Sequence, residues 1–217
     1  MTPDLAQVLN TLTHEIRTPL AVSQGYLTLL LEGRLTDAEQ ARTAMDQTRQ
    51  ALGALATYCA DMGKISALSE GGLKGIPVRL SASDFAMIVR GHDEVRDATF
   101  SGTVGGGQIE SPAASDLAHA VALVVQAALD AARDSAQTVE LSGDHGSLVL
   151  LAGAADALPA VRPGPGAPTA RPVNFAKGGR GLKLIWAAFV LDRHGVETWT
   201  AEGARASVGL RIPLVMP

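Results

Sequence analysis

Two long stretches of helical periodicity, joined by a short break, occupy the first third of the chain. In the first, from about 4 to 32, apolar side chains recur mostly three or four residues apart: Leu5, Leu9, Leu12, Ile16, Leu20, Leu27 and Leu30 or Leu31. In the second, to about 68, the spacing alternates between three and four as in a coiled-coil seam: Met45, Thr48, Leu52, Leu55, Cys59 and Met62. Two such helices form an antiparallel hairpin. Because a lone hairpin leaves its apolar stripes half covered, the pattern predicts a homodimeric four-helix bundle.

The break between the two helices contains two boundary signals. Gly33 interrupts the first helix, and Thr36-Asp-Ala-Glu39 matches a capping box. In such a box the threonine side chain caps the helix and the glutamate occupies the third helical position. We therefore expect Thr36 to be the N-cap of the second helix.

Beyond a glycine-rich linker at 70–75 the pattern becomes a mixture of helices and strands. Helices are expected at 85–94 after an Asp84 cap, at 117–133, and at 182–193 with Gly195 near the end. Strands are expected at 139–141, 148–151 and 208–212, and a proline-rich loop at 162–168. The predicted fold class is an all-α helical hairpin over 1–70, followed by an α/β sandwich over 76–217.

Composition argues against several kinds of partner and site. A net charge of −4 gives no reason to expect nucleic acid or an anionic membrane as a partner. Cys59 is the only cysteine, and the remaining histidines have no metal-ligand spacing: His92, His119, His145 and His194. No uncharged apolar run reaches the roughly 18 residues of a membrane span, and the first residues lack the order of a signal peptide. We expect a cytoplasmic protein without a metal site.

Pro19 is an unusual residue for the interior of the first helix. It removes an amide donor and clashes with the carbonyl of Glu15, four residues back, at a cost of about 3 kcal/mol. The helix is therefore expected to bend or loosen beside His14. His14 lies off the apolar stripe, so we expect its imidazole to reach solvent, where an unprotonated ring nitrogen near neutral pH is a nucleophile.

Two polar neighbours complete this short motif. The Glu15 carboxylate could accept a hydrogen bond from one imidazole nitrogen and raise the basicity of the other. Thr18 lies one helical turn beyond His14, so its hydroxyl can reach the same face and orient a water. A surface histidine on an amphipathic helix is the alternative interpretation. Pro19 and the paired helices favour chemistry at His14.

The run Thr13-His-Glu-Ile-Arg-Thr-Pro-Leu20 resembles the H-box of the dimerisation and histidine-phosphotransfer domain of sensor histidine kinases. The resemblance implies that His14 is phosphorylated and that Glu15 is the acid/base group. It implies that Thr18 orients the water that dephosphorylates a response regulator. Arg17 and Pro19 are the supporting residues of the motif.

The second half of the chain resembles the ATP-binding domain of GHKL type. Gly179-Arg-Gly181-Leu182 and the later Asp192-Arg-His-Gly195 resemble its second glycine box, although Lys183 replaces the last glycine. Two asparagines of the family correspond here to Gln126 and Asp130. The aspartate that reads adenine corresponds to Gly153, and its two glycines to Ala155 and Ala157. Loss of a buried acceptor for adenine predicts a large loss of nucleotide affinity, although Lys177, Arg180 and Lys183 could still hold an anion.

These features predict a histidine phosphotransferase or pseudokinase that exchanges a phosphoryl group between His14 and receiver-domain aspartates. Its expected partners are the receiver domains of response regulators or hybrid kinases, and the same site could also act as a phosphatase. The relay needs no cofactor. A working kinase with altered ATP boxes is one alternative, and it alone would require ATP and Mg²⁺. The other alternative is a non-catalytic scaffold that binds a receiver.

Overall fold

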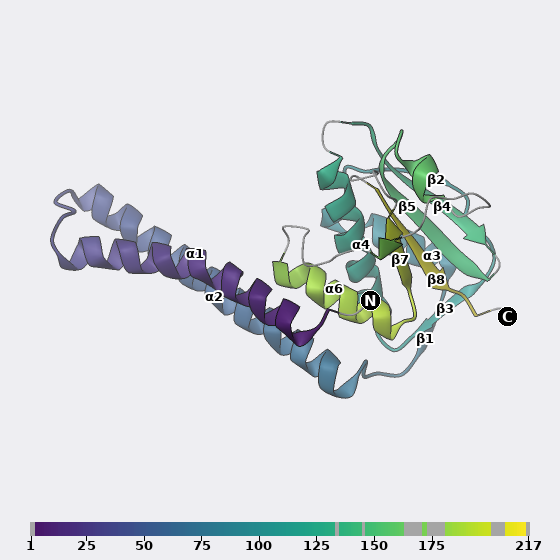
Figure 1. Ribbon diagram of the computed structural model, residues 1–217, viewed down its shortest axis with the longest axis horizontal. Helices are drawn as coiled ribbons and strands as arrows, with labels where there is room; N and C mark the ends of the chain where they lie inside the picture. The colour runs from purple at the N-terminus through teal and green to yellow at the C-terminus, as the bar shows by residue number, and fades with distance from the viewer. Residues whose placement is uncertain are drawn as a thin grey trace.

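A helical hairpin projects from an α/β domain in the computed structural model (Figure 1). The structure describes residues 3–132, 135–144, 146–162, 171–172, 181–200 and 207–215. The hairpin consists of α1 (Leu5–Leu31) and α2 (Ala38–Gly71). The predicted fold class, a helical hairpin followed by an α/β sandwich, is confirmed.

The α/β domain is built on a mixed sheet. The strands of the domain are β1 (Val78–Ser81), β2 (Thr99–Gly102), β3 (Gln108–Ser111), β4 (Gln137–Asp144), β5 (Ser147–Ala154), β6 (Arg171–Pro172), β7 (Glu197–Thr200) and β8 (Ser207–Pro213). The sheet has the order β2-β4-β5-β8-β7-β6, with β2 and β4 parallel and the other neighbours antiparallel, whereas β1 and β3 form a separate antiparallel ribbon. The helices are α3 (Ala82–Arg90), α4 (Ala114–Ala131), α5 (Leu158–Val161) and α6 (Gly181–Arg193), with a 3-10 turn at Asp93–Val95.

The caps of the two hairpin helices differ from the sequence prediction. The N-cap of α2 is Asp37, whose carboxylate accepts a hydrogen bond from the Glu39 amide, so the assignment of Thr36 as N-cap is wrong. Both residue types cap helices well, and the position of Asp37 directly before the first helical residue decides the outcome. A complete capping box instead begins α1, where Asp4 and Gln7 exchange hydrogen bonds of 2.7 and 3.0 Å.

Other boundaries in the α/β domain also differ. The helix predicted at 85–94 ends at Arg90, followed by Gly91, and its cap is Ser81, which accepts from the Asp84 amide at 3.0 Å. Asp84 therefore lies inside the helix. The sequence analysis missed the four-residue strands β1, β2, β3 and β7, because four residues are too few to show a clear alternating pattern.

The helix α4 forms the centre of the main core. Leu117, Val121 and Val125 have no exposed surface, and they pack with the sheet, α3 and α6. Among the described helices, α4 is the one whose length and composition would suit a membrane span. Its burial under α3 and α6 instead identifies it as the core helix of the domain.

The hairpin and the α/β domain meet through α6, which lies between α2 and α4 (Figure 1). Leu182 and Ile185 of α6 are buried against Val8 of α1 and Ile65 of α2. At the other end of α6, the Arg193 guanidinium donates to the carbonyl of Leu68 near the end of α2, at 3.1 Å. The whole length of α6 is thus attached to the base of the hairpin.

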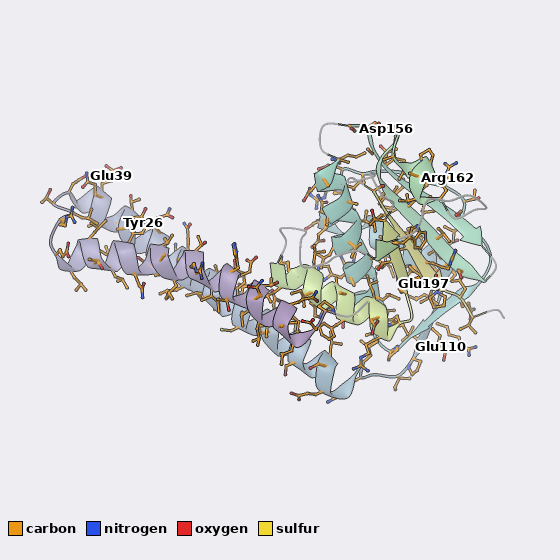
Figure 2. The ribbon with its side chains drawn as sticks, viewed as in Figure 1. Tyr26, Glu39, Glu110, Asp156, Arg162 and Glu197 are labelled. Carbon is orange, nitrogen blue, oxygen red and sulfur yellow. The ribbon has the colours of Figure 1, made fainter. Side chains whose placement is uncertain are left out.

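The distal part of the hairpin, where Tyr26 and Glu39 lie, extends away from the α/β domain (Figure 2). Its inner seam uses small and polar residues, including the buried Ala44, Thr48 and Ala51. Several residues of the predicted apolar stripes instead remain exposed: Leu20, Leu27, Leu31, Met45 and Leu52. Leu27, Met45 and Leu52 line an open apolar groove of about 280 Å³. We call these five exposed residues the leucine face.

His194 follows α6 and connects it to the β1–β3 ribbon. Its Nδ1 atom lies 2.8 Å from the Val190 carbonyl and its Nε2 atom 2.6 Å from the Ser111 hydroxyl, which fits a neutral imidazole that donates to the first and accepts from the second. Burial lowers the pKa of His194, although the Val190 hydrogen bond and the charge of Asp116 act in the opposite direction.

This lowered pKa predicts an acid-dependent loss of stability. Below about pH 6.5 the unfolded chain binds a proton at His194 that the folded chain binds only at lower pH, so the free energy of unfolding falls as the pH falls. Urea unfolding between pH 8 and 5 is expected to show a steeper acid decline for the natural protein than for His194→Gln. Parallel curves for the two proteins would contradict this.

Candidate functional site

His14 lies in the middle of α1 and its side chain is exposed. It borders an open groove of about 390 Å³ between the two helices of the hairpin. The lining residues are His14, Glu15, Thr18, Pro19 and Val22 from α1, and Gln47, Gln50, Ala51 and Tyr58 from α2. The three residues singled out for chemistry, His14, Glu15 and Thr18, are therefore brought together at one surface.

Glu15 contacts a neighbour that the sequence analysis did not identify. Tyr58 of α2 lines the same groove, and the Glu15 carboxylate acts on its phenol through hydrogen bonding and negative charge. In the described part of the chain, no hydrogen bond or ion pair links Glu15 to His14. Consecutive side chains on an α-helix point about 100° apart, so Glu15 turns toward α2 when His14 faces solvent.

Tyr58 is held as a hydrogen-bond donor. Burial raises the pKa of the Tyr58 phenol, and the hydrogen bond and the negative charge of Glu15 raise it further. The phenol therefore keeps its proton throughout the neutral range. The sequence could not predict that Tyr58 lies near Glu15. The pairing depends on how α1 and α2 are aligned in the hairpin, which the sequence pattern does not specify.

The other residues of the motif have different environments. Arg17 and Thr18 are exposed, whereas Pro19 is buried against α2. The helix α1 continues without interruption through Pro19, and the Ser23 hydroxyl donates to the Pro19 carbonyl at 2.9 Å. Pro19 therefore contributes to the hairpin seam beside the histidine.

The two positions on α4 that the resemblance assigned to a vestigial nucleotide site bond to each other. The Gln126 amide donates to the Asp130 carboxylate at 2.6 Å, one turn apart on the same helix. Gly153 lies within β5, opposite Thr138 of β4 and Ser207 of β8. The segment beyond it forms α5, whose Leu158 and Val161 are buried against Val149 and Leu151 of the sheet. Gly153, the position that the resemblance matched to an adenine-reading aspartate, thus carries no side-chain carboxylate.

The structure describes only some of the residues that resemble the second glycine box. Gly181 begins α6 with φ +52°, and its Cα lies so close to the Glu15 carboxylate that a Cβ would overlap the carboxylate. Leu182 is buried against the hairpin, and Lys183 is exposed. Gly179, Lys177, Arg180 and most of the proline-rich segment lie outside the described residues, as does His145.

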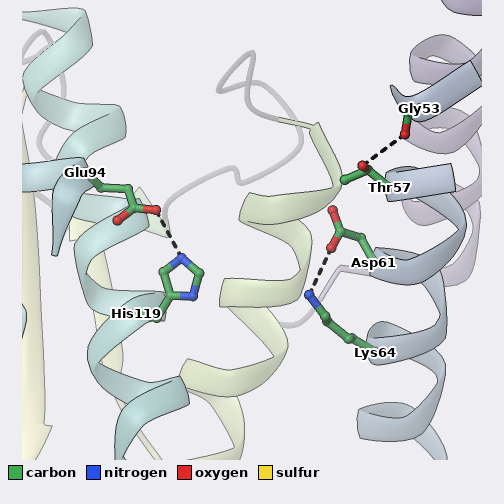
Figure 3. Close-up of polar contacts among 6 residues, drawn as sticks. All are labelled: Gly53, Thr57, Asp61, Lys64, Glu94 and His119. Carbon is green, nitrogen blue, oxygen red and sulfur yellow. Dashed lines mark hydrogen bonds and ion pairs between the residues drawn. The ribbon is translucent and has the colours of Figure 1, made fainter. Parts of the chain in front are cut away.

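Two further histidines lie together in the α/β domain. The rings of His92 and His119 are stacked, with their centroids 5.2 Å apart, and His119 Nε2 lies 3.2 Å from the Glu94 carboxylate (Figure 3). Burial alone would raise the pKa of Glu94, but a backbone hydrogen bond and the two histidines lower it overall. Among the described residues, no group of three or more His, Cys, Asp or Glu side chains is arranged to hold a metal ion.

Comparison with known proteins was made by family, by sequence and by structure. Residues 4–64 match the His Kinase A (phospho-acceptor) domain family. No curated protein gives a significant sequence match. The Acinetobacter baumannii histidine kinase AdeS is 12% identical, with a TM-score of 0.59 over 93% of this chain and 98% of that chain. The histidine kinase ThkA, crystallised in complex with response regulator protein TrrA, is 16% identical, with a TM-score of 0.58 over 94% of this chain and 60% of that chain.

The hairpin with His14 at its groove is thus a His Kinase A phospho-acceptor domain, and the α/β domain has the fold of a histidine kinase catalytic domain. Residues 4–64 therefore match a phospho-acceptor domain family, whereas the likeness of the whole chain to histidine kinases is one of fold.

Proposed function

We propose that this protein relays phosphoryl groups between receiver-domain aspartates through His14 and does not require ATP. The observation that carries the proposal is the contrast between its two sites. An open groove borders an exposed histidine, whereas Gln126 and Asp130 bond to each other at the vestigial nucleotide site. A relay needs the first site and does not use the second.

The chemistry requires few groups. An unprotonated imidazole nitrogen of His14 attacks the phosphorus of an aspartyl phosphate. The N–P bond forms as the P–O bond to the aspartate breaks, and the aspartate leaves as a carboxylate. Glu15 is the group that would accept a hydrogen bond from the other ring nitrogen and favour its positive charge. The exposed hydroxyl of Thr18 would orient a water for hydrolysis of a phosphorylated receiver.

The nucleotide-binding positions support independence from ATP. Gly153 offers no side-chain acceptor to the adenine amino group, and a missing acceptor in a buried recognition site costs orders of magnitude in affinity. The 2.6 Å bond with Asp130 uses one N–H of the Gln126 amide, so that donor is not available to a nucleotide.

The proposed partners are a receiver domain and a second copy of this chain. ThkA is one protein of this fold that was crystallised with a response regulator, and we place the receiver against the groove beside His14. The leucine face supports a homodimer, because Leu20, Leu27 and Leu52 remain between 43% and 53% exposed on the hairpin.

A labelling experiment tests the relay. The purified chain is incubated with radiolabelled Mg-ATP, and separately with a panel of receiver domains phosphorylated by phosphoramidate. We expect acid-labile, alkali-stable phosphate on His14 from at least one phosphorylated receiver and none above background from Mg-ATP. Labelling of His14 by Mg-ATP alone would establish the kinase instead, and no labelling from any receiver would favour a scaffold.

A further inference from the structure

The Glu15 carboxylate lies at a junction of three helices. Its own helix is α1, the Tyr58 phenol of α2 donates a hydrogen bond to it, and Gly181 at the start of α6 lies against it. Glu15 and Tyr58 also line the groove that contains His14. One carboxylate therefore touches both helices of the hairpin, the docked domain and the reaction groove.

The start of α6 is held firmly at this junction. Leu182, the residue after Gly181, and Ile185, one helical turn further on, are 2% and 0% exposed. They pack on Val8 and Ile65, one on each helix of the hairpin. The position of Gly181 relative to Glu15 is therefore set by an apolar interface.

We propose that Tyr58 and Gly181 are positioning residues for Glu15, so that the docked α/β domain orders the acid beside His14. This inference rests on the proposed role of Glu15 in phosphoryl transfer at His14. Tyr58 fixes the carboxylate by hydrogen bonding. Gly181 permits the contact because it has no Cβ.

The geometry explains why this position holds glycine. At φ +52° an L side chain is strained, and a Cβ would also overlap the Glu15 carboxylate. Gly33 provides a matched comparison, because its φ of +63° carries the same strain and no atom lies within 4 Å of the position of its Cβ. A methyl group at either position strains the backbone. At 181 it also displaces the Glu15 carboxylate, whereas at 33 it displaces no neighbour.

Hydrogen exchange of α6 and of the second half of α2 tests the contact without any receiver. Gly181→Ala is expected to accelerate exchange at this interface by about tenfold, and Gly33→Ala to leave it unchanged. Adding Glu15→Ala to Gly181→Ala removes the overlap but keeps the backbone strain at 181, so exchange is expected to return part of the way to that of Glu15→Ala alone. Equal exchange in Gly181→Ala and the natural protein, or failure of Glu15→Ala to restore protection, would overturn the contact.

Transfer kinetics test the positioning role. Tyr58→Phe keeps the ring but removes the hydrogen bond to a charged group, so the maximal rate of transfer to His14 is expected to fall by about tenfold. The concentration of phosphorylated receiver that gives half the maximal rate is expected to stay the same. Tyr26→Phe, on the distal hairpin, is the control and is expected to behave as the natural protein. An unchanged rate, or a change only in the half-saturating concentration, would refute positioning.

The two experiments separate the inference from the relay itself. If no receiver labels the natural protein, the relay fails, whereas the exchange results still decide whether Glu15 holds Gly181. If the natural protein is labelled and Tyr58→Phe is unaffected, the relay stands and the positioning role is wrong.

Discussion

A His14→Ala variant is expected to accept no phosphoryl group from a phosphorylated receiver, because no other nitrogen in the groove can serve as the nucleophile. The loss should be complete, since the covalent intermediate itself cannot form. The His14 side chain is exposed, so the free energy of unfolding is expected to change by less than about 0.5 kcal/mol. Autoradiography of the acid-labile label, together with urea unfolding, measures both effects.

A second histidine variant provides the control. His92→Ala also removes an imidazole, but from the stacked pair in the α/β domain. We expect it to be labelled as the natural protein is. Label that persists in His14→Ala, or disappears in His92→Ala, would place the acceptor elsewhere in the chain.

The double variant Leu27→Asp/Leu52→Asp is expected to convert the proposed homodimer into monomers. Both side chains are about half exposed on the hairpin, at 46% and 53%. If a partner copy covers them, burial of the four leucines of the dimer contributes roughly 4 kcal/mol to the free energy of dimerisation. Losing this contribution should raise the dissociation constant of the dimer by about 1000-fold. Burial of the introduced charges would add to this loss. Sedimentation velocity over a concentration series measures the change.

Thr28→Asp/Thr43→Asp is the control for charge on the hairpin. Both threonines are exposed, and helical spacing places them away from Leu27 and Leu52. This variant is expected to remain dimeric. A natural protein that sediments as a monomer at all concentrations, or equal dissociation of the two double variants, would show that the leucine face is not the dimer interface.

Local patterns were sufficient to predict the main architecture. The spacing of leucines predicted two long helices, and the position of His14 off that stripe predicted its exposure. Both depend only on the period of the α-helix. The same reasoning failed at Asp37, because adjacent residues can both cap a helix. It also failed at β1, β2, β3 and β7, because strands of four residues are too short for a clear alternating pattern.

The sequence by itself determined the hairpin and the exposed histidine, because each is encoded in a few neighbouring residues. Only the tertiary structure decided the surroundings of Glu15. Tyr58 and Gly181 are far from Glu15 in the chain, and they meet it because the hairpin register and the burial of Leu182 and Ile185 bring three helices to one point. Such contacts depend on the packing of distant segments, which local periodicity does not encode.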